Sequence, residues 1–101
     1  MIEVRAVRHV LIRGAVQGVG YRRWLELEAQ ARKIEGWVRN RRDGTVEAVF
    51  SGPLAAVTAM IHACRKGPAL ARVTTVDVHE VNARELDQRR TGEAFSLLAT
   101  V

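Results

Sequence analysis

Apolar and polar positions divide the chain into stretches of two kinds. Residues 7–13 and 45–50 alternate between apolar and polar side chains and are rich in β-branched residues, a pattern typical of strands. Residues 22–33 instead repeat apolar side chains every three or four positions among good helix formers, which predicts a helix. Over the whole chain the pattern predicts strands at 7–13, 37–41, 45–50, 73–79 and 95–99 and helices at 22–33 and 51–65.

Glycine, proline and polar residues mark the connections between these elements. Asp43 and Gly44 lie between two predicted strands and favour a tight hairpin turn, Gly67-Pro68 ends the second helix, and the polar residues 82–93 predict a loop. The order β-α-β-β-α-β with a further strand is that of the split βαβ arrangement. We therefore predict an α+β fold, a ferredoxin-like βαββαβ sandwich. One antiparallel sheet would carry two helices on one face, with a short C-terminal strand.

The composition agrees with a single domain over residues 1–101. The chain is 48% hydrophobic and 27% charged, close to the balance of ordinary globular proteins. No apolar run is long enough to cross a bilayer, and the first residues do not resemble a signal peptide, so we expect a cytoplasmic protein with no membrane partner. Cys64 is the only cysteine, which excludes an internal disulfide, and its place in a helical pattern predicts a buried structural thiol.

The net charge of +5 favours anionic partners. Nucleic acids, phosphorylated metabolites and anionic lipids all belong to this class. The same order of elements also builds RNA-binding modules, but these stack bases on aromatic side chains of their central strands. Strand 45–50 offers only Phe50 for that purpose. We therefore expect no nucleic-acid partner, and an RNA-binding or regulatory ferredoxin-like module stays an alternative to an enzyme.

The most informative segment is residues 14–20, where three glycines in seven residues connect a strand to a helix. The backbone N–H groups of such a turn can converge on an anion, at the positive end of the helix dipole. Arg22 and Arg23 follow directly, although cations are unfavourable at a helix N-terminus unless an anion binds there. We expect Arg22 to bind that anion, because a guanidinium matches phosphate oxygens in a two-pronged geometry, and Arg23 to face solvent.

This loop differs from the common nucleotide-binding loops. The Walker pattern ends in Gly-Lys-Ser/Thr, whereas Tyr21 follows Gly20, and the dinucleotide pattern needs a glycine where Arg23 stands. The three histidines are isolated in the sequence, so the chain shows no cluster with metal-ligand spacing. We expect no cofactor and no metal.

Two segments of this sequence resemble the signatures of the acylphosphatase family. Residues 12–22 (Ile-Arg-Gly-Ala-Val-Gln-Gly-Val-Gly-Tyr-Arg) resemble the first, and residues 36–40 (Gly-Trp-Val-Arg-Asn) with 43–47 (Asp-Gly-Thr-Val-Glu) resemble the second. The resemblance covers nearly the whole chain, with Lys33 a departure where many relatives carry a glycine that closes the helix. It implies that Arg22 binds phosphate and that Asn40 positions water. It also implies a phosphate-binding loop made of Ala15, Val16, Gln17, Gly18, Val19, Gly20, Tyr21 and Arg22.

The resemblance further implies hydrolysis of the carboxyl–phosphate anhydride of a small acyl phosphate, with inorganic phosphate as product or inhibitor. The residues suit this chemistry, because a carboxylate is a good leaving group and needs no strong general acid or covalent nucleophile. What remains is neutralising charge on the phosphoryl oxygens and placing one water in line. We expect the protein to act as a monomer.

Overall fold

A computed structural model describes residues 3–101. It contains one sheet of five strands in the order β4-β1-β3-β2-β5, two α-helices and one 3₁₀-helix. The elements in chain order are β1 (Arg5–Ala15), α1 (Tyr21–Ala31), β2 (Glu35–Asn40), β3 (Val46–Pro53), α2 (Leu54–Lys66), β4 (Arg72–Glu80), η1 (Ala83–Gln88) and β5 (Phe95–Leu97).

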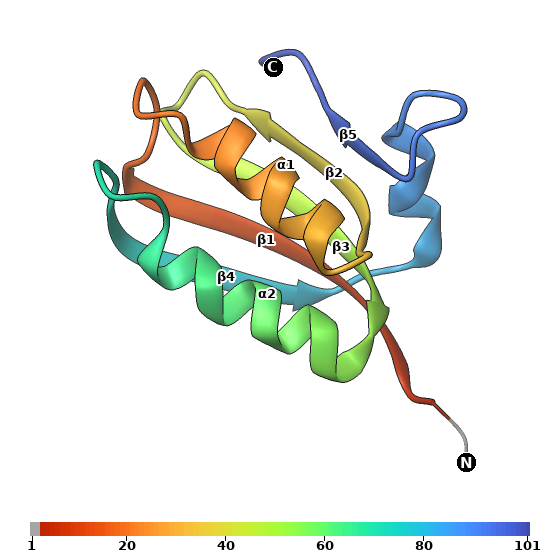
Figure 1. The fold of residues 1–101 in the computed structure, drawn as a ribbon. Coiled ribbons are helices and arrows are strands. Elements are labelled where there is room, and N and C mark those ends of the chain that lie inside the picture. The colour runs from red at the N-terminus through yellow and green to blue at the C-terminus, as the bar shows by residue number, and fades with distance from the viewer. Residues whose placement is uncertain (1–2) are drawn as a thin grey trace.

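The two α-helices lie side by side on the same face of the sheet (Figure 1). α1 packs on β2 and β5, and α2 packs on β1, β3 and β4. This is the predicted ferredoxin-like sandwich, which the structure confirms. β1, β2, β3 and β4 pair antiparallel as expected, but β5 joins the edge of β2 in parallel, so the sheet is mixed.

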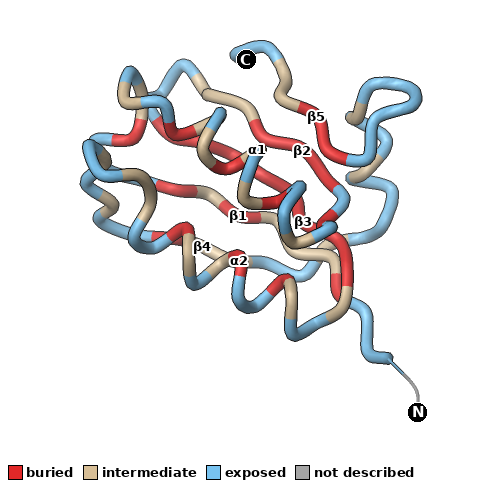
Figure 2. Tube along the Cα trace, viewed as in Figure 1, coloured by how far each residue is buried: buried red, intermediate tan, exposed pale blue. Residues whose placement is uncertain are grey.

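The hydrophobic core lies between the sheet and the two helices, where the buried parts of the chain face one another (Figure 2). Alternate residues of each strand point to this side because side chains alternate along a strand. The helices contribute one stripe each, as their apolar spacing predicts. The core includes Val10, Ile12, Leu25, Ala29, Val38, Val46, Phe50, Val57, Met60 and Cys64, all fully buried.

The prediction of a plain loop over residues 82–93 is wrong in part, because this segment contains η1. The Asn82 side chain accepts a hydrogen bond from the Arg84 N–H at 2.8 Å and so caps the first turn. η1 packs against β2 and β3, and the Trp37 indole donates to the Glu85 carbonyl at 2.6 Å. A short 3₁₀ turn of exposed residues carries no apolar periodicity, which is why the sequence pattern did not reveal it.

Between residues 3 and 101, none of the helices has the length and apolar character needed to cross a membrane.

Candidate active site

The loop between β1 and α1 presents main-chain N–H groups at the start of α1. Gly18 and Gly20 have φ values of 74° and 79°, in the left-handed region that glycine adopts without strain. A Cβ atom added at either position would meet no heavy atom within 4 Å, so this side of the loop is open. Gly20 occupies the N-cap position and offers no capping side chain. The unpaired N–H groups of the first helical turn can therefore serve an anion.

Gln17 fastens this loop to the turn between β2 and β3. Its side-chain amide donates hydrogen bonds to the carbonyl of Arg41 at 2.7 Å and to that of Thr45 at 2.8 Å. These two carbonyls lie on either side of the turn. The loop and the turn consequently lie next to each other at one end of the sheet (Figure 1).

A pocket of about 200 Å³ opens at this end of the sheet. The loop and the first turn of α1 form one side of it, and the end of β2 together with β5 forms the other. Its lining residues are Val16, Gln17, Gly18, Gly20, Tyr21, Arg22, Arg23, Asn40 and Leu97.

Arg22 brings a half-buried guanidinium to this pocket. Its Nη1 lies 3.4 Å from the Leu98 carbonyl, in the segment that follows β5. Within residues 3–101 no carboxylate lies within ion-pair distance of Arg22. Arg23 differs, because its exposed guanidinium forms an ion pair with Glu26 at 2.6 Å. The positive charge of Arg22 is thus available to an anion in the pocket.

Asn40 approaches the pocket from the opposite side. It is the last residue of β2, and it pairs with Val46 in the final step of the β2–β3 ladder. Its main-chain carbonyl accepts a hydrogen bond from the Val101 N–H at 3.1 Å. Asn40 is one of the residues that line the pocket. Because side chains alternate along a strand, it lies on the same face of the sheet as the buried Val38, which is the face that carries the helices and the loop.

Seven of the nine residues expected at the site line this pocket, whereas Ala15 and Val19 do not. Ala15 is an exposed residue at the end of β1, and Val19 packs against the core. Tyr21 lines the pocket although the residue is only 1% exposed, because it also belongs to the hydrophobic core. Leu97 is a lining residue that the sequence analysis missed. Its place depends on the parallel pairing of β5 with β2, and no local signal in a three-residue strand indicates that pairing.

Cys64, the only cysteine of the chain, is unsuited to act as a nucleophile. It is fully buried, as predicted, and burial raises the pKa of its thiol to about 12. A thiol of this kind carries almost no thiolate at neutral pH, and thiolate is the reactive form.

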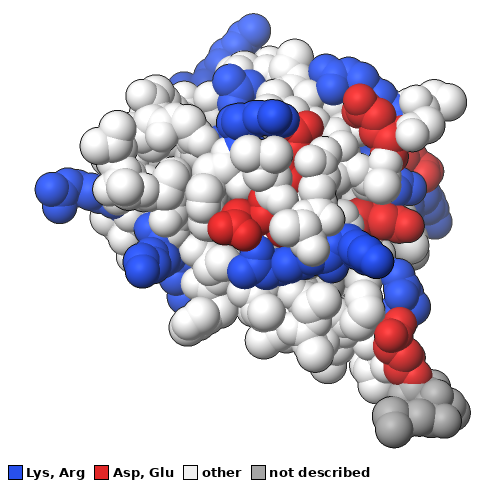
Figure 3. Space-filling model, viewed as in Figure 1, with Lys and Arg blue, Asp and Glu red and all other residues white. Residues whose placement is uncertain are grey.

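The distribution of charge on the surface adds little to this picture. On the face shown in Figure 3, basic side chains are spread over many elements and acidic side chains lie among them. We therefore base the expectation of an anion in the pocket on the loop, the helix terminus and Arg22, more than on the net charge of +5.

Comparison with known proteins identifies the family. The sequence model of the acylphosphatase family matches residues 8–92. The chain belongs to the acylphosphatase family. It is 55% identical to the acylphosphatase of Bradyrhizobium diazoefficiens over 97 residues, which cover 96% of this chain and 98% of that protein.

Solved acylphosphatase structures share the fold. The acylphosphatase from Bacillus subtilis matches with a TM-score of 0.79 at 33% identity, over 94% of this chain and 99% of that one. The acylphosphatase from Coxiella burnetii matches with a TM-score of 0.81 at 26% identity, over 93% of both chains. Acylphosphatases are hydrolases of acyl phosphates. Membership of this family decides against the RNA-binding and regulatory alternatives that the sequence pattern had left open.

Proposed function

We propose that this chain hydrolyses the carboxyl–phosphate anhydride of small acyl phosphates, with Arg22 and Asn40 as its catalytic residues. The observation that carries the proposal is that one pocket is lined by the open glycine loop, by Asn40 and by Arg22, whose guanidinium has no carboxylate within ion-pair distance among residues 3–101. These groups match the requirements of the reaction, which are charge neutralisation at phosphorus and placement of one water.

The phosphoryl group occupies the loop formed by residues 15–21. Main-chain N–H groups of the loop and of the first turn of α1 donate to its oxygens, and Arg22 donates from the side of the segment that follows β5. Inorganic phosphate, the product, fits the same groups and acts as an inhibitor. Every residue of the site comes from one chain, so a monomer suffices for activity. A cytoplasmic location stays a prediction.

Asn40 places the attacking water opposite the leaving carboxylate. Its amide oxygen accepts a hydrogen bond from the water, while its NH₂ group donates to a phosphoryl oxygen. The water oxygen forms a bond to phosphorus as the bond between phosphorus and the acyl oxygen breaks. The acyl group leaves as carboxylate with the electron pair of that bond, and one proton of the water passes to solvent. The low basicity of the leaving carboxylate removes the need for a general acid.

The test is phosphate release from benzoyl phosphate by the parent protein and by variants of Arg22. Arg22→Ala and Arg22→Lys are expected to lose about a hundredfold or more in kcat, because each removes a donor that serves the developing charge. Arg32→Ala is the matched control. Arg32 lies at the other end of α1, where it pairs with Glu28 at 2.6 Å, and its loss removes the same charge. Turnover near the parent value in Arg22→Ala would contradict the assignment.

A further inference from the structure

Glu47 is a buried carboxylate that the proposed chemistry does not use. It lies on β3 between Val46 and Ala48, which belong to the core under the helices. Because side chains alternate along a strand, Glu47 points to the opposite face of the sheet. Its side chain is only 8% exposed. Burying a carboxylate is costly unless it is paired and hydrogen-bonded, so its partners are informative.

Three cationic or polar side chains surround this carboxylate. Arg39 donates through Nε to Oε1 at 2.7 Å, and Arg41 approaches the same oxygen through Nη1 at 3.4 Å. His9 of β1 lies 2.7 Å from Oε2 through its Nε2. The Arg39 guanidinium also lies 4.6 Å from the centre of the Trp37 ring, which fixes it from the other side. We call these four residues, His9, Arg39, Arg41 and Glu47, the Glu47 cluster.

The Glu47 cluster includes the residues on both sides of Asn40 in the chain. Arg39 and Arg41 are the two chain neighbours of Asn40, and both contact the single carboxylate of Glu47. In the ladder Arg39 pairs with Glu47, and the next and last step pairs Asn40 with Val46. Past this step the Arg41 N–H still donates to the Thr45 carbonyl at 2.9 Å, so the side-chain contacts to Glu47 add to main-chain hydrogen bonds at this end of β2. The Glu47 cluster therefore fastens β2 to β3 on both sides of the residue that faces the pocket.

We propose that Glu47 is a positioning residue that holds the main chain on both sides of Asn40, and so fixes the direction in which the Asn40 carboxamide points. This inference rests on the proposed function, in which Asn40 places water. It explains why a carboxylate and two arginines are kept on the sheet face away from the pocket. Placement matters here because an error of about 1 Å in a positioned group can cost up to about a hundredfold in rate.

The expected kinetic effect is specific. Glu47→Gln keeps the shape of the side chain but removes the charge that attracts both arginines. It should lower kcat for benzoyl phosphate about tenfold, with KM changed by less than about twofold, because Asn40 acts mainly in the transition state. Glu80→Gln is the matched control. It removes the same charge and a cross-strand ion pair, with Arg8 at 3.4 Å, and it leaves the Glu47 cluster intact.

A double-mutant cycle with Asn40→Ala separates positioning from general stability. If Glu47 acts through Asn40, Glu47→Gln should lower kcat in the parent but leave the residual kcat of Asn40→Ala unchanged. The same factor of loss in both backgrounds would overturn the proposal, and so would a parent kcat in Glu47→Gln. Arg39→Gln removes the contact between Arg39 and Glu47 from the side of β2. It should likewise lower kcat in the parent and leave the residual kcat of Asn40→Ala unchanged. This variant provides the test if Glu47→Gln does not fold.

The cycle also keeps the two proposals apart. A parent rate in Asn40→Ala alone would contradict the proposed role of Asn40 and, with it, the role of Glu47. A reduced rate in Asn40→Ala combined with additive losses from Glu47→Gln would contradict only the role of Glu47, and the proposed function would stand.

Discussion

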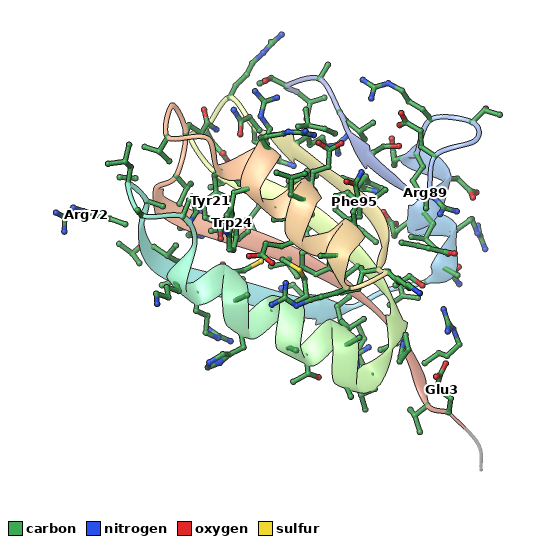
Figure 4. All side chains as sticks on the ribbon, viewed as in Figure 1. Glu3, Tyr21, Trp24, Arg72, Arg89 and Phe95 are labelled. Atoms are coloured by element: carbon green, nitrogen blue, oxygen red, sulfur yellow. The ribbon has the colours of Figure 1, made fainter. Side chains whose placement is uncertain are left out.

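The hydroxyl of Tyr21 donates a hydrogen bond to the main-chain carbonyl of Cys64 at 2.5 Å. This bond joins the first residue of α1 to the last turn of α2, where helical carbonyls have no partner within the helix. The Tyr21 ring also packs edge-on against Trp24, with centroids 5.3 Å apart, and Figure 4 shows the two side chains next to each other. The residue that begins the helix at the pocket is thus fixed to the second helix by a buried polar contact.

Tyr21→Phe should lower the free energy of unfolding by about 1–2 kcal/mol, because it leaves the buried Cys64 carbonyl without its donor. For a domain of this size the melting temperature should fall by roughly 4–8 °C per kcal/mol. Burial raises the pKa of the Tyr21 phenol far above its ordinary value, so the hydroxyl stays protonated and the loss should not vary between pH 6 and pH 9. A urea titration at several pH values measures both quantities. A loss below about 0.3 kcal/mol would show that this hydrogen bond contributes little.

Lys33, which follows the C-cap residue Arg32 of α1, has an unfavourable main-chain conformation. Its φ is 56°, in the left-handed region. The Lys33 N–H donates to Gln30 at 3.1 Å and the Ile34 N–H donates to Ala29 at 2.9 Å, which is the Schellman pattern that normally uses glycine at this position. Lys33→Gly should therefore raise the free energy of unfolding by about 0.5–1 kcal/mol, since it removes the clash of Cβ in the left-handed region.

Lys66→Gly is the matched control for this change. Lys66 is the last residue of α2, and its φ is not positive, so glycine relieves no strain there. The substitution removes the same charge but should lower stability by about 0.5–1 kcal/mol because glycine is a poor helix former. Thermal melts of Lys33→Gly and Lys66→Gly in the same buffer, each compared with the parent, measure the two shifts in melting temperature. Equal shifts in the same direction would mean that charge, and not backbone conformation, determines the effect.

The parts of the molecule that local patterns encode were predictable from the sequence. Alternation, helical spacing and the Asp43-Gly44 turn predict seven of the eight elements, all but η1, and the glycine loop followed by Arg22 predicts where the pocket opens. Features that depend on strand register were not predictable. The parallel pairing of β5 places Leu97 at the pocket, and the pairing of Arg39 with Glu47 builds a cluster across strands. Both pairings bring together residues from separate strands, and the pattern of apolar residues within either strand does not indicate them.

The Gln17 side chain illustrates the same limit at the site itself. The sequence marks it as one residue of a glycine-rich loop, whereas the structure shows that its amide bonds two carbonyls, 24 and 28 residues away along the chain. The role of such a residue depends on which turn lies beside the loop. That neighbourhood is set by the packing of the whole sheet, and it becomes visible only in three dimensions.

Because of Glu47, the free energy of unfolding should depend on pH in the acid range. Burial by itself raises the pKa of this carboxyl, but the hydrogen bonds from His9 and Arg39 outweigh burial and hold the pKa below its ordinary value of 4.5. A lowered pKa means that the folded state binds the proton less readily than the unfolded chain. The stabilisation is therefore complete above pH 4.5 and is lost as the pH falls through the lower, folded-state value.

Glu47→Gln should lower the free energy of unfolding by about 1.5–3 kcal/mol at pH 7, the range for hydrogen bonds to charged groups. The difference in the free energy of unfolding between this variant and the parent should become smaller as the pH falls below about 4.5, where the parent carboxyl also becomes neutral. Urea titrations between pH 3 and pH 7 measure the difference. Glu80→Gln, whose carboxylate is 83% exposed, should show a small difference at every pH. A difference for Glu47→Gln that stays constant down to pH 3 would contradict the lowered pKa.

Inorganic phosphate should stabilise the folded protein through Arg22. The glycine loop, the first turn of α1 and the Arg22 guanidinium converge on one pocket only in the folded state, so phosphate binds the folded chain and not the unfolded one. At a phosphate concentration ten times the dissociation constant, this linkage raises the free energy of unfolding by about 1.4 kcal/mol. The corresponding rise in melting temperature is roughly 5–10 °C for a domain of this size.

The measurement is a series of thermal melts across a phosphate titration at constant ionic strength. Phosphate also strengthens hydrophobic burial non-specifically, and this part of the shift should survive any single substitution. Arg22→Ala should therefore keep only the non-specific part, whereas Arg32→Ala, which removes an arginine from the opposite end of α1, should keep the whole shift. The difference between the two variants isolates binding at the pocket. If both variants respond to phosphate equally, the anion is not held by Arg22, and the site of the chemistry lies elsewhere on the molecule.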